Sequence, residues 1–366
     1  MKIGILTTSR ADFGIYLPLL KKIDAHPHMS YCIFAGGTHM SPGFGLTYKL
    51  IEKEGFDIME KVESIIEDDS PEGIAKSIGL TSQKFAEVWE RHANRLDLLF
   101  VLGDRFEMFA AAAATIPFGI PLAHLHGGEI TLGAIDNKFR NAITSFSSYH
   151  FVATSNNANR VEAAIGDNQG VYHVGALGVE GLLNSNTYSP EKFKSHFNFN
   201  IREAFVLLTY HPETINIGNN ESAITQLLQF VLSIPEMVLC SLPNADTEGS
   251  IIRKKLLAFE ESHPNKIKCI ENLGQLGYYT AMQHCRMMIG NSSSGIIEAA
   301  SFNKPVVNIG DRQKGREVSG NVIQAGNNEK DIAKGYQSAL ELIGEEFKNV
   351  YGDGHTSSRI IQILSV

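Results

Sequence analysis

The sequence lacks a long apolar run, paired cysteines and any block of charge of one sign. No stretch approaches the roughly 18 consecutive apolar residues that a membrane-spanning helix needs. Four cysteines are scattered without a CxxC pair, so we expect buried small side chains in a reducing compartment. Acidic and basic residues are interspersed and the formal net charge is −8. We therefore expect neither a nucleic-acid partner nor a membrane partner.

Two nucleotide-binding fingerprints are also missing. No GxGxxG follows the first predicted strand, where residues 7–14 are expected to form a loop, so nicotinamide chemistry loses its main support. No GxxxxGK[ST] occurs anywhere in the chain. The long apolar region and cleavage site of a signal peptide do not follow Met1, which favours a cytoplasmic protein.

Short apolar runs alternate with amphipathic stretches along the whole chain. Strand-like runs occur at residues 2–6, 31–35, 98–102, 121–125, 150–153, 170–174, 174–177, 205–209, 237–240, 267–269, 287–289 and 306–309. Such runs, separated by helices, are typical of parallel sheets covered on both faces. The chain of 366 residues is long enough for about two domains. We predict an α/β fold of two doubly wound domains, 1–178 and 179–351, that face a cleft, with a hinge near 183–200.

Unusual polar residues follow the predicted strands. Ligands in doubly wound sheets bind beyond the carboxyl ends of the strands. Side chains placed after several separate strands have little reason to be there for packing alone, so we expect the ligand site at these ends. The residues concerned are Arg10, Gly36, Gly37, Asp104, the segment 124–129, His211 and the segment 290–294.

The strongest single motif is Gly-Asn-Ser-Ser-Ser-Gly at 290–295, which follows a strand and opens a helix. Backbone N–H groups, serine hydroxyls and the helix dipole all favour a phosphate there. A serine-rich helix cap is the alternative. Glu298, on the same helix, could accept hydrogen bonds from ribose hydroxyls. Arg312, just after a strand, could add positive charge to a diphosphate.

Carboxylates and imidazoles follow two neighbouring strands of the first predicted domain. Asp104 ends one strand, His124, His126 and Glu129 follow the next, and Asp136 and Arg140 lie beyond them. Such crowding pushes pKa values apart and permits general acid and base roles. Asp104 is alternatively a helix cap. His124 and His126 alternate on one strand face, but without a third ligand they give weak support for zinc.

Two further residues are open to two interpretations each. Arg10 is placed to reach an anion across a cleft, or it pairs with Asp12 at the surface. His211 ends the first strand of the second predicted domain and is either an active-site residue or a histidine bonded to backbone.

Several segments, taken in order, resemble the hydrolysing UDP-N-acetylglucosamine 2-epimerases of sialic-acid and related nonulosonate biosynthesis, and more distantly the non-hydrolysing 2-epimerases. They span nearly the full length: TTSRADFG, GGTHMSPGFG, GDRFEMFAAA, HLHGGEITLGAIDNKFRNAIT, YHPET, PNAD and GNSSSGIIEAASFNKPVVNIGDRQKGRE. The resemblance implies two Rossmann-like lobes similar to the GT-B glycosyltransferases. It also implies that the C-terminal segment, about 352–366, packs back on the first lobe.

The resemblance also assigns roles. The nucleotide and its diphosphate would be held by Arg10, Arg105, His211, Asn244, Asn272, Ser292, Ser293, Glu298 and Arg312. Asp104 and Asp136 would belong to the proton-transfer apparatus. His211 is also a catalytic candidate, because its strand-end position is expected to lie opposite these acids. Many hydrolysing members carry a glutamate where this chain has His126. Either Glu129 takes over part of its work or His126 is itself the base.

The implied reaction eliminates UDP to give a 2-acetamidoglucal, and water then adds at C1 to give the free 2-epimer. This chemistry requires neither a metal nor a redox cofactor. UDP-N-acetylglucosamine is the default substrate, UDP-N,N′-diacetylbacillosamine is the alternative, and a homodimer or homotetramer is expected. The rivals are a non-hydrolysing epimerase, a retaining glycosyltransferase and a nucleotide-sugar binding module without catalysis.

Overall fold

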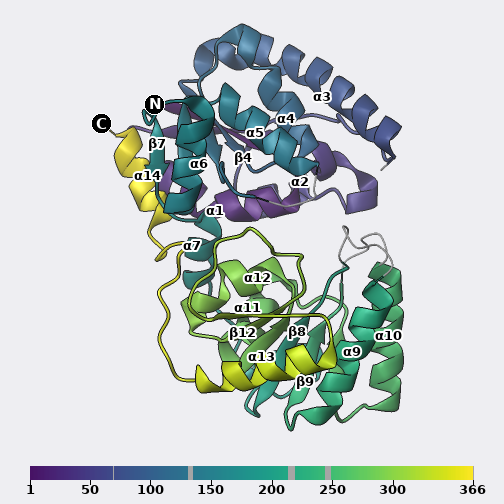
Figure 1. The fold of residues 1–366 in the computed structure, drawn as a ribbon. Coiled ribbons are helices and arrows are strands. Elements are labelled where there is room, and N and C mark those ends of the chain that lie inside the picture. The colour runs from purple at the N-terminus through teal and green to yellow at the C-terminus, as the bar shows by residue number, and fades with distance from the viewer. Residues whose placement is uncertain (69, 131–134, 213–218, 244–248, 366) are drawn as a thin grey trace. The chain divides into compact units, whose positions relative to one another are not determined.

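The computed structural model describes all residues except 69, 131–134, 213–218, 244–248 and 366 (Figure 1). The chain divides into two compact units. The first contains the described residues of Met1–Ile130, Ala134–Gly181 and Tyr351–Val366, and the second contains those of Leu182–Val350. The limits of 178 and 352 inferred from the sequence lie close to these.

A parallel sheet forms the centre of the first unit. Its order is β3-β2-β1-β4-β5-β6-β7, and every pair of neighbours is parallel. The strands are β1 (Lys2–Thr7), β2 (Ser30–Ala35), β3 (Ile58–Lys61), β4 (Leu98–Leu102), β5 (Leu122–Leu125), β6 (Tyr149–Val152) and β7 (Val171–His173). The helices are α1 (Arg10–Asp24), α2 (Tyr48–Lys53), α3 (Pro71–His92), α4 (Phe106–Ala113), α5 (Asp136–Phe146), α6 (Ser155–Ile165), α7 (Leu177–Leu183) and α14 (Thr356–Leu364).

The second unit has a six-stranded parallel sheet with the order β10-β9-β8-β11-β12-β13. Its strands are β8 (Phe205–Thr209), β9 (Met237–Ser241), β10 (Ile267–Ile270), β11 (Met287–Gly290), β12 (Val306–Ile309) and β13 (Val322–Ala325). Its helices are α8 (Pro190–Phe197), α9 (Asn220–Ser233), α10 (Gly249–Ser262), α11 (Gly274–His284), α12 (Ser293–Ile297) and α13 (Glu329–Glu341). The prediction of two parallel-sheet α/β domains is confirmed.

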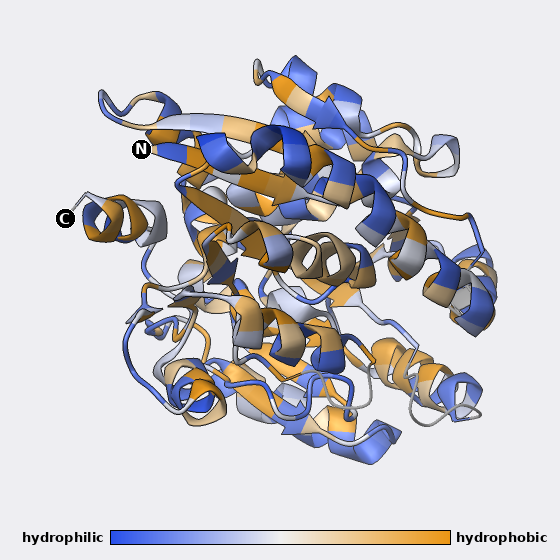
Figure 2. Ribbon diagram, turned by 90° about the horizontal axis from the view of Figure 1, so that it is seen from above, coloured by the Kyte–Doolittle hydropathy of each residue, from blue (hydrophilic) through white to orange (hydrophobic). Residues whose placement is uncertain are grey.

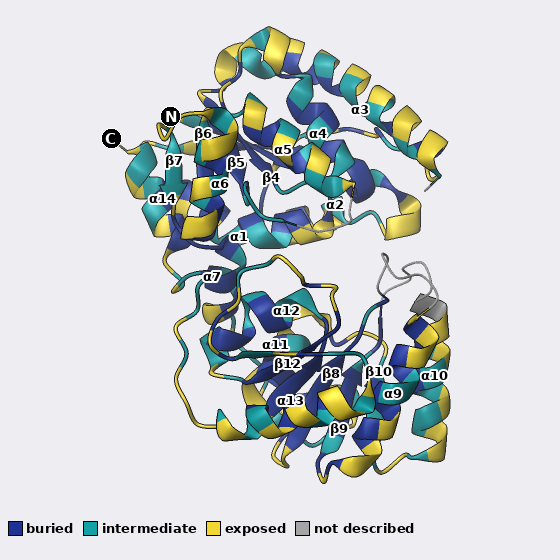
Figure 3. Ribbon diagram, viewed as in Figure 1, coloured by how far each residue is buried: buried dark blue, intermediate teal, exposed yellow. Residues whose placement is uncertain are grey.

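Burial explains why these segments form strands. All five residues of β4 and of β8 are buried, as expected for strands covered by helices on both faces. Figure 2 shows the apolar central strands, and Figure 3 shows them buried while the helices expose one side. The four cysteines are free and buried, as predicted. Within the described part of the chain, no helix is long and apolar enough to cross a membrane.

Two local predictions were wrong, and two strands were missed. The segment 7–14 is not a loop throughout, because α1 already begins at Arg10, with Ser9 as its N-cap. The segment 174–177 is not a strand, and α7 begins at its last residue. The edge strands β3 and β13 were missed because they are only partly buried and so lack a continuous apolar run.

The C-terminal segment is fixed to the first unit by buried hydrogen bonds. Helix α14 packs against α1. Glu180 on α7 is buried, and its carboxylate accepts hydrogen bonds from the backbone N–H of Ser357 at 2.6 Å and from its hydroxyl at 2.5 Å. The backbone N–H of Ala176 donates to the carbonyl of Tyr351 at 2.6 Å. These contacts hold the C-terminal segment against residues 176–180, close to where the first unit ends.

Candidate active site

Asp104 and Arg140 connect the ends of two strands in the first unit. Asp104 follows β4, and its carboxylate forms an ion pair with the guanidinium of Arg140 on α5. Arg140 is buried, and its Nη1 also donates to the backbone carbonyl of Glu129 at 2.7 Å. The N-cap position of α4 belongs to Arg105. Asp104 is therefore not the helix cap that was one of the two interpretations of its position.

His126 and Glu129 form a hydrogen-bonded dyad. Nδ1 of His126 lies 2.6 Å from Oε1 of Glu129, and both side chains are largely buried. An ionised carboxylate only accepts, so the ring N–H at Nδ1 donates and the neutral ring keeps its lone pair at Nε2. His126 also has a left-handed φ of 63°. Such strain in a residue other than glycine is typical of functional sites.

Gly128 fixes the loop that carries Glu129. Its φ is 73°, and a Cβ atom there would lie 2.3 Å from the carbonyl oxygen of Asn157 on α6. Nη1 of Arg160, also on α6, donates to the carbonyl of Gly128 at 3.3 Å. Only glycine allows this close approach, so α6 determines where the loop places Glu129.

His124 lies in β5, next to the strand ends, and is fully buried. Its Nε2 donates to the carbonyl of Gly103 at 2.9 Å, so its Nδ1 accepts from the hydroxyl of Thr144 at 3.1 Å. Burial lowers the pKa of His124 to about 3. Strand β5 ends at Leu125, so the alternation expected to pair His124 with His126 does not continue. Among the residues that the structure describes, no cluster of His, Cys, Asp and Glu could hold a metal ion.

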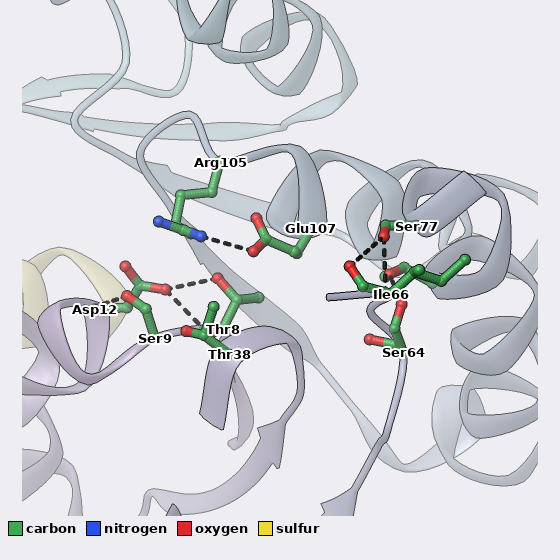
Figure 4. Close-up of polar contacts among 10 residues, drawn as sticks. Thr8, Ser9, Asp12, Thr38, Ser64, Ile66, Ser77, Arg105 and Glu107 are labelled. Carbon is green, nitrogen blue, oxygen red and sulfur yellow. Dashed lines mark hydrogen bonds and ion pairs between the residues drawn. The ribbon is translucent and has the colours of Figure 1, made fainter. Parts of the chain in front are cut away.

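Arg10 and Asp12 do not form the surface pair that was one alternative. The carboxylate of Asp12 instead accepts hydrogen bonds from the backbone N–H of Thr8 at 3.0 Å and from its hydroxyl at 2.7 Å (Figure 4). Arg10 is exposed at the start of α1 and, within the described ranges, its side chain makes no hydrogen bond or ion pair. Its charge is therefore available to an anion.

Arg105 lies among three carboxylates. Nη2 of Arg105 donates to Oε1 of Glu107 at 2.7 Å (Figure 4). Burial alone would lower the pKa of Arg105, but Glu107, with Asp12 and Asp136 as weaker contributors, raises it. Asp136 is half-buried and is the first residue of α5. The predicted residues Asp104, Arg105 and Asp136 thus belong to one charged region of the first unit.

In the second unit, Asn291 joins three strand ends. It follows β11 and is fully buried. Its Oδ1 accepts from the backbone N–H of His211 at 2.7 Å, and its Nδ2 donates to the carbonyl of His211 at 2.9 Å. Its own carbonyl accepts from Arg312 at 3.0 Å and from Gln313 at 2.8 Å. The structure therefore places His211, Arg312 and the serine-rich loop beside one another.

The serine-rich loop opens α12 as predicted. The hydroxyl of Ser292 caps the helix by accepting from the N–H of Ser294 at 3.3 Å, and Ser293 is the first helical residue. Gly290 has a φ of 135°, and a Cβ there would lie 2.0 Å from the carbonyl oxygen of Thr209. Glycine thus lets β11 approach β8 where the loop begins. Both serines are half-buried and retain capacity for a ligand.

Glu298 ends α12 with an incompletely satisfied carboxylate. Its Oε1 is 3.5 Å from the hydroxyl of Tyr279. Its Oε2 is buried and has no hydrogen-bond partner among the described residues. Burial raises the pKa of this carboxyl group. A donor from a ligand would satisfy the group.

The remaining predicted residues differ in what the structure says of them. Asn272 is exposed after β10, and its Oδ1 accepts from the N–H of Gly274 at 2.7 Å, at the start of α11. Asn244 lies outside the described residues. Asn291 was not singled out within its motif. Arg140 had no assigned role, although its position four residues after Asp136 places both on one side of α5.

The sequence matches known proteins over most of its length, and the fold matches a solved structure over all of it. The family model described as UDP-N-acetylglucosamine 2-epimerase matches residues 21–365. The chain is 34% identical over 363 residues to UDP-N,N′-diacetylbacillosamine 2-epimerase (hydrolyzing) of Legionella pneumophila, covering 99% of this chain and 95% of that protein. It is 35% identical over 348 residues to GDP/UDP-N,N′-diacetylbacillosamine 2-epimerase (hydrolyzing) of Campylobacter jejuni, covering 95% and 88%.

A solved structure shares the same two-domain, GT-B-like fold. It is that of UDP-GlcNAc 2-epimerase from Neisseria meningitidis bound to UDP-GlcNAc, with a TM-score of 0.83, 17% identity and 100% coverage of both chains. At this identity the likeness concerns the fold alone. The family model and the two relatives together show that the chain belongs to the UDP-N-acetylglucosamine 2-epimerase family.

Proposed function

We propose that the protein is a hydrolysing 2-epimerase that converts UDP-N,N′-diacetylbacillosamine to its free 2-epimer and UDP. The observation that carries this proposal is the similarity, over 99% and 95% of the chain, to two relatives named as hydrolysing 2-epimerases of that sugar. UDP-N-acetylglucosamine is the second candidate, since the family model bears its name and a homologue from Neisseria meningitidis, 25% identical over 357 residues, is named for it.

In the first step of the proposed reaction, the bond from C1 to the UDP oxygen breaks as the C2 proton is removed. This proton is barely acidic, so the base must act while the leaving group departs. We assign the base to Nε2 of His126. Glu129, 2.6 Å from Nδ1, holds the proton on the other nitrogen and stabilises the imidazolium that forms. The product of this step is a 2-acetamidoglucal with a double bond between C1 and C2.

The leaving group needs stabilisation of its developing negative charge. We assign this to Arg10 and Arg312 and to the N-terminus of α12 with Ser292 and Ser293, because cations and free N–H groups at the position of a developing anion lower the barrier. The other proposed contacts to the nucleotide and its diphosphate come from Glu298 to the ribose hydroxyls and from Arg105, His211, Asn244 and Asn272.

In the second step, water adds across the double bond. The hydroxyl group goes to C1 and a proton goes to C2 on the face opposite to the one it left. We assign this proton transfer to Asp104 and Asp136. Support comes from the buried Arg140, which bonds both Asp104 and the backbone of Glu129. The proposed acid Asp104 and the loop that carries the proposed base are therefore held near each other.

The test is incubation of the protein with each UDP-sugar in deuterated water, followed by NMR. The expected product from UDP-N,N′-diacetylbacillosamine is a free 2-epimer with deuterium at C2, together with free UDP. A UDP-linked epimer would instead move the protein to the non-hydrolysing type. Turnover of UDP-N-acetylglucosamine alone would favour the second candidate. Transfer to an acceptor with C2 untouched would indicate a glycosyltransferase.

The other expectations from the resemblance stay predictions. We propose that the enzyme acts in the cytoplasm, in nonulosonate biosynthesis, as a homodimer or homotetramer. Light scattering coupled to size-exclusion chromatography measures the oligomeric state directly, and a monomeric mass at micromolar concentration would contradict that part.

A further inference from the structure

Glu107 is a buried carboxylate beside the predicted ligand site. It lies in the first turn of α4, and its side chain is only 1% exposed. Its Oε1 accepts from Nη2 of Arg105 at 2.7 Å (Figure 4). Its Oε2 is buried and has no hydrogen-bond partner among the residues that the structure describes. Glu107 therefore has one strong interaction, and that interaction is with Arg105.

Stability alone does not account for this carboxylate. Burying a charge is costly unless its partner and its remaining hydrogen bonds compensate, and a neutral group of similar shape often serves a fold as well or better. Here the partner is 40% exposed, and one oxygen stays unsatisfied. A role other than stabilising the fold would explain why this position holds a carboxylate.

Glu107 is the strongest of three carboxylates that interact with Arg105. The carboxylates of Asp12 and Asp136 also attract the guanidinium electrostatically. A long arginine side chain adopts the conformation that brings it to the carboxylate with the strongest attraction. Asp12 is already occupied by two hydrogen bonds from Thr8. Glu107 is the carboxylate to which Arg105 donates a hydrogen bond, and this pairing through Nη2 leaves other N–H groups of the guanidinium for a ligand.

We propose that Glu107 is a positioning residue, which holds the guanidinium of the half-exposed Arg105 so that its remaining N–H groups bind the diphosphate of the UDP-sugar. This inference rests on the proposed function, in which Arg105 contacts the nucleotide. Removal of the negative charge by Glu107→Gln keeps the size of the side chain but loosens Arg105. UDP binding should weaken about tenfold, the loss of one charge-assisted contact, and KM should rise with kcat changing much less.

The experiment is a double-mutant cycle with UDP as the probe, measured by calorimetry. Wild type, Glu107→Gln, Arg105→Gln and the double variant are compared for the Kd of UDP, KM, kcat and melting temperature. In the Arg105→Gln background, Glu107→Gln should have no further effect on Kd. Glu107→Asp, which keeps the charge one methylene further back, should lose part of the binding. Glu52→Gln, which breaks the exposed pair with Lys61 in the same unit, is the matched control.

Several outcomes would overturn the inference. A Kd for UDP that is unchanged in Glu107→Gln would do so, as would an equal loss with and without Arg105. A lower melting temperature with unchanged Kd and KM would assign Glu107 to the fold. If wild type bound UDP but turned over neither sugar, the proposed function would fail while the cycle on UDP binding would still decide the role of Glu107.

Discussion

Three buried histidines, His39, His124 and His150, should make the first unit sensitive to acid, because burial lowers the pKa of each. His39 is fully buried, with Nε2 2.9 Å from the hydroxyl of Thr7 and Nδ1 2.9 Å from that of Thr47. Burial lowers the pKa of His39 from 6.5 to about 4 and that of His124 from 6.5 to about 3. Neither of these two imidazoles has a carboxylate as its hydrogen-bond partner, so each is held in its neutral form.

The sign and size follow from proton linkage. Between pH 6.5 and pH 4 the unfolded chain takes up protons at these histidines and the folded chain does not, so stability present above pH 6.5 is lost as the pH falls. From pH 7 to pH 5, each of the three histidines accounts for a loss of about 2 kcal/mol. A folded domain is stable by only about 5–15 kcal/mol.

The single tryptophan provides the assay. Trp89 is fully buried in the core of the first unit, where its Nε1 donates to the carbonyl of Ala111 at 3.0 Å. Urea unfolding followed by its fluorescence at pH 7 and pH 5 gives the free energy of unfolding of this unit. His39→Gln keeps hydrogen-bonding capacity but cannot be protonated. The variant should lose about 2 kcal/mol less than wild type between the two pH values.

His173→Gln, at an exposed position of β7, controls for the loss of any histidine. If wild type and His39→Gln lost equal stability between pH 7 and pH 5, the argument from burial would be refuted. The result also matters for catalysis. A fall in activity below pH 6 is assigned to the site only where the fluorescence shows that the first unit remains folded.

Three further predictions concern the site itself. Asp104→Asn should lower kcat by a factor of about 100 or more while UDP binds as before, and unchanged turnover in a single-turnover assay would remove Asp104 from the mechanism. Gly128→Ala should cost about 2 kcal/mol or more, because φ is 73° and the new Cβ would meet the carbonyl of Asn157 at 2.3 Å. Urea unfolding measures this, and a stable, active variant would contradict it. Glu298→Gln should stabilise the ligand-free protein at pH 8, because a pKa raised by burial makes ionisation costly as the pH rises above 4.5, and it should weaken UDP binding; calorimetry and thermal unfolding check both effects.

The strands that were predicted from sequence are those whose own residues form a continuous apolar run. A continuous apolar run such as that of β4 has no other plausible place than the middle of a parallel sheet. The edge strands β3 and β13 are partly exposed and so give no such signal. The early start of α1 has a local signature in Ser9 and Asp12, since a serine followed three residues later by an acid resembles a helix cap.

The candidate site was predictable in its residue types but not in its pairings. Asp104 and Arg140 are 36 residues apart, so their ion pair depends on how β4 and α5 pack. The dyad of His126 and Glu129 is local, but it requires a left-handed histidine. In the same loop, Gly128 packs against the backbone of Asn157, a contact between segments far apart in the chain that no pattern within HLHGGE shows.

Two pairs of buried polar groups among the described residues differ in a way that bears on function. The rings of His39 and His124 are neutral with both nitrogens bonded, so the fold itself satisfies them. Glu107 and Glu298 each keep a buried oxygen without a partner among the described residues. A fold gains nothing from such atoms, and both carboxylates lie near strand ends, where a ligand enters a doubly wound sheet. At these two carboxylates a ligand would supply the hydrogen bonds that the fold leaves unmade.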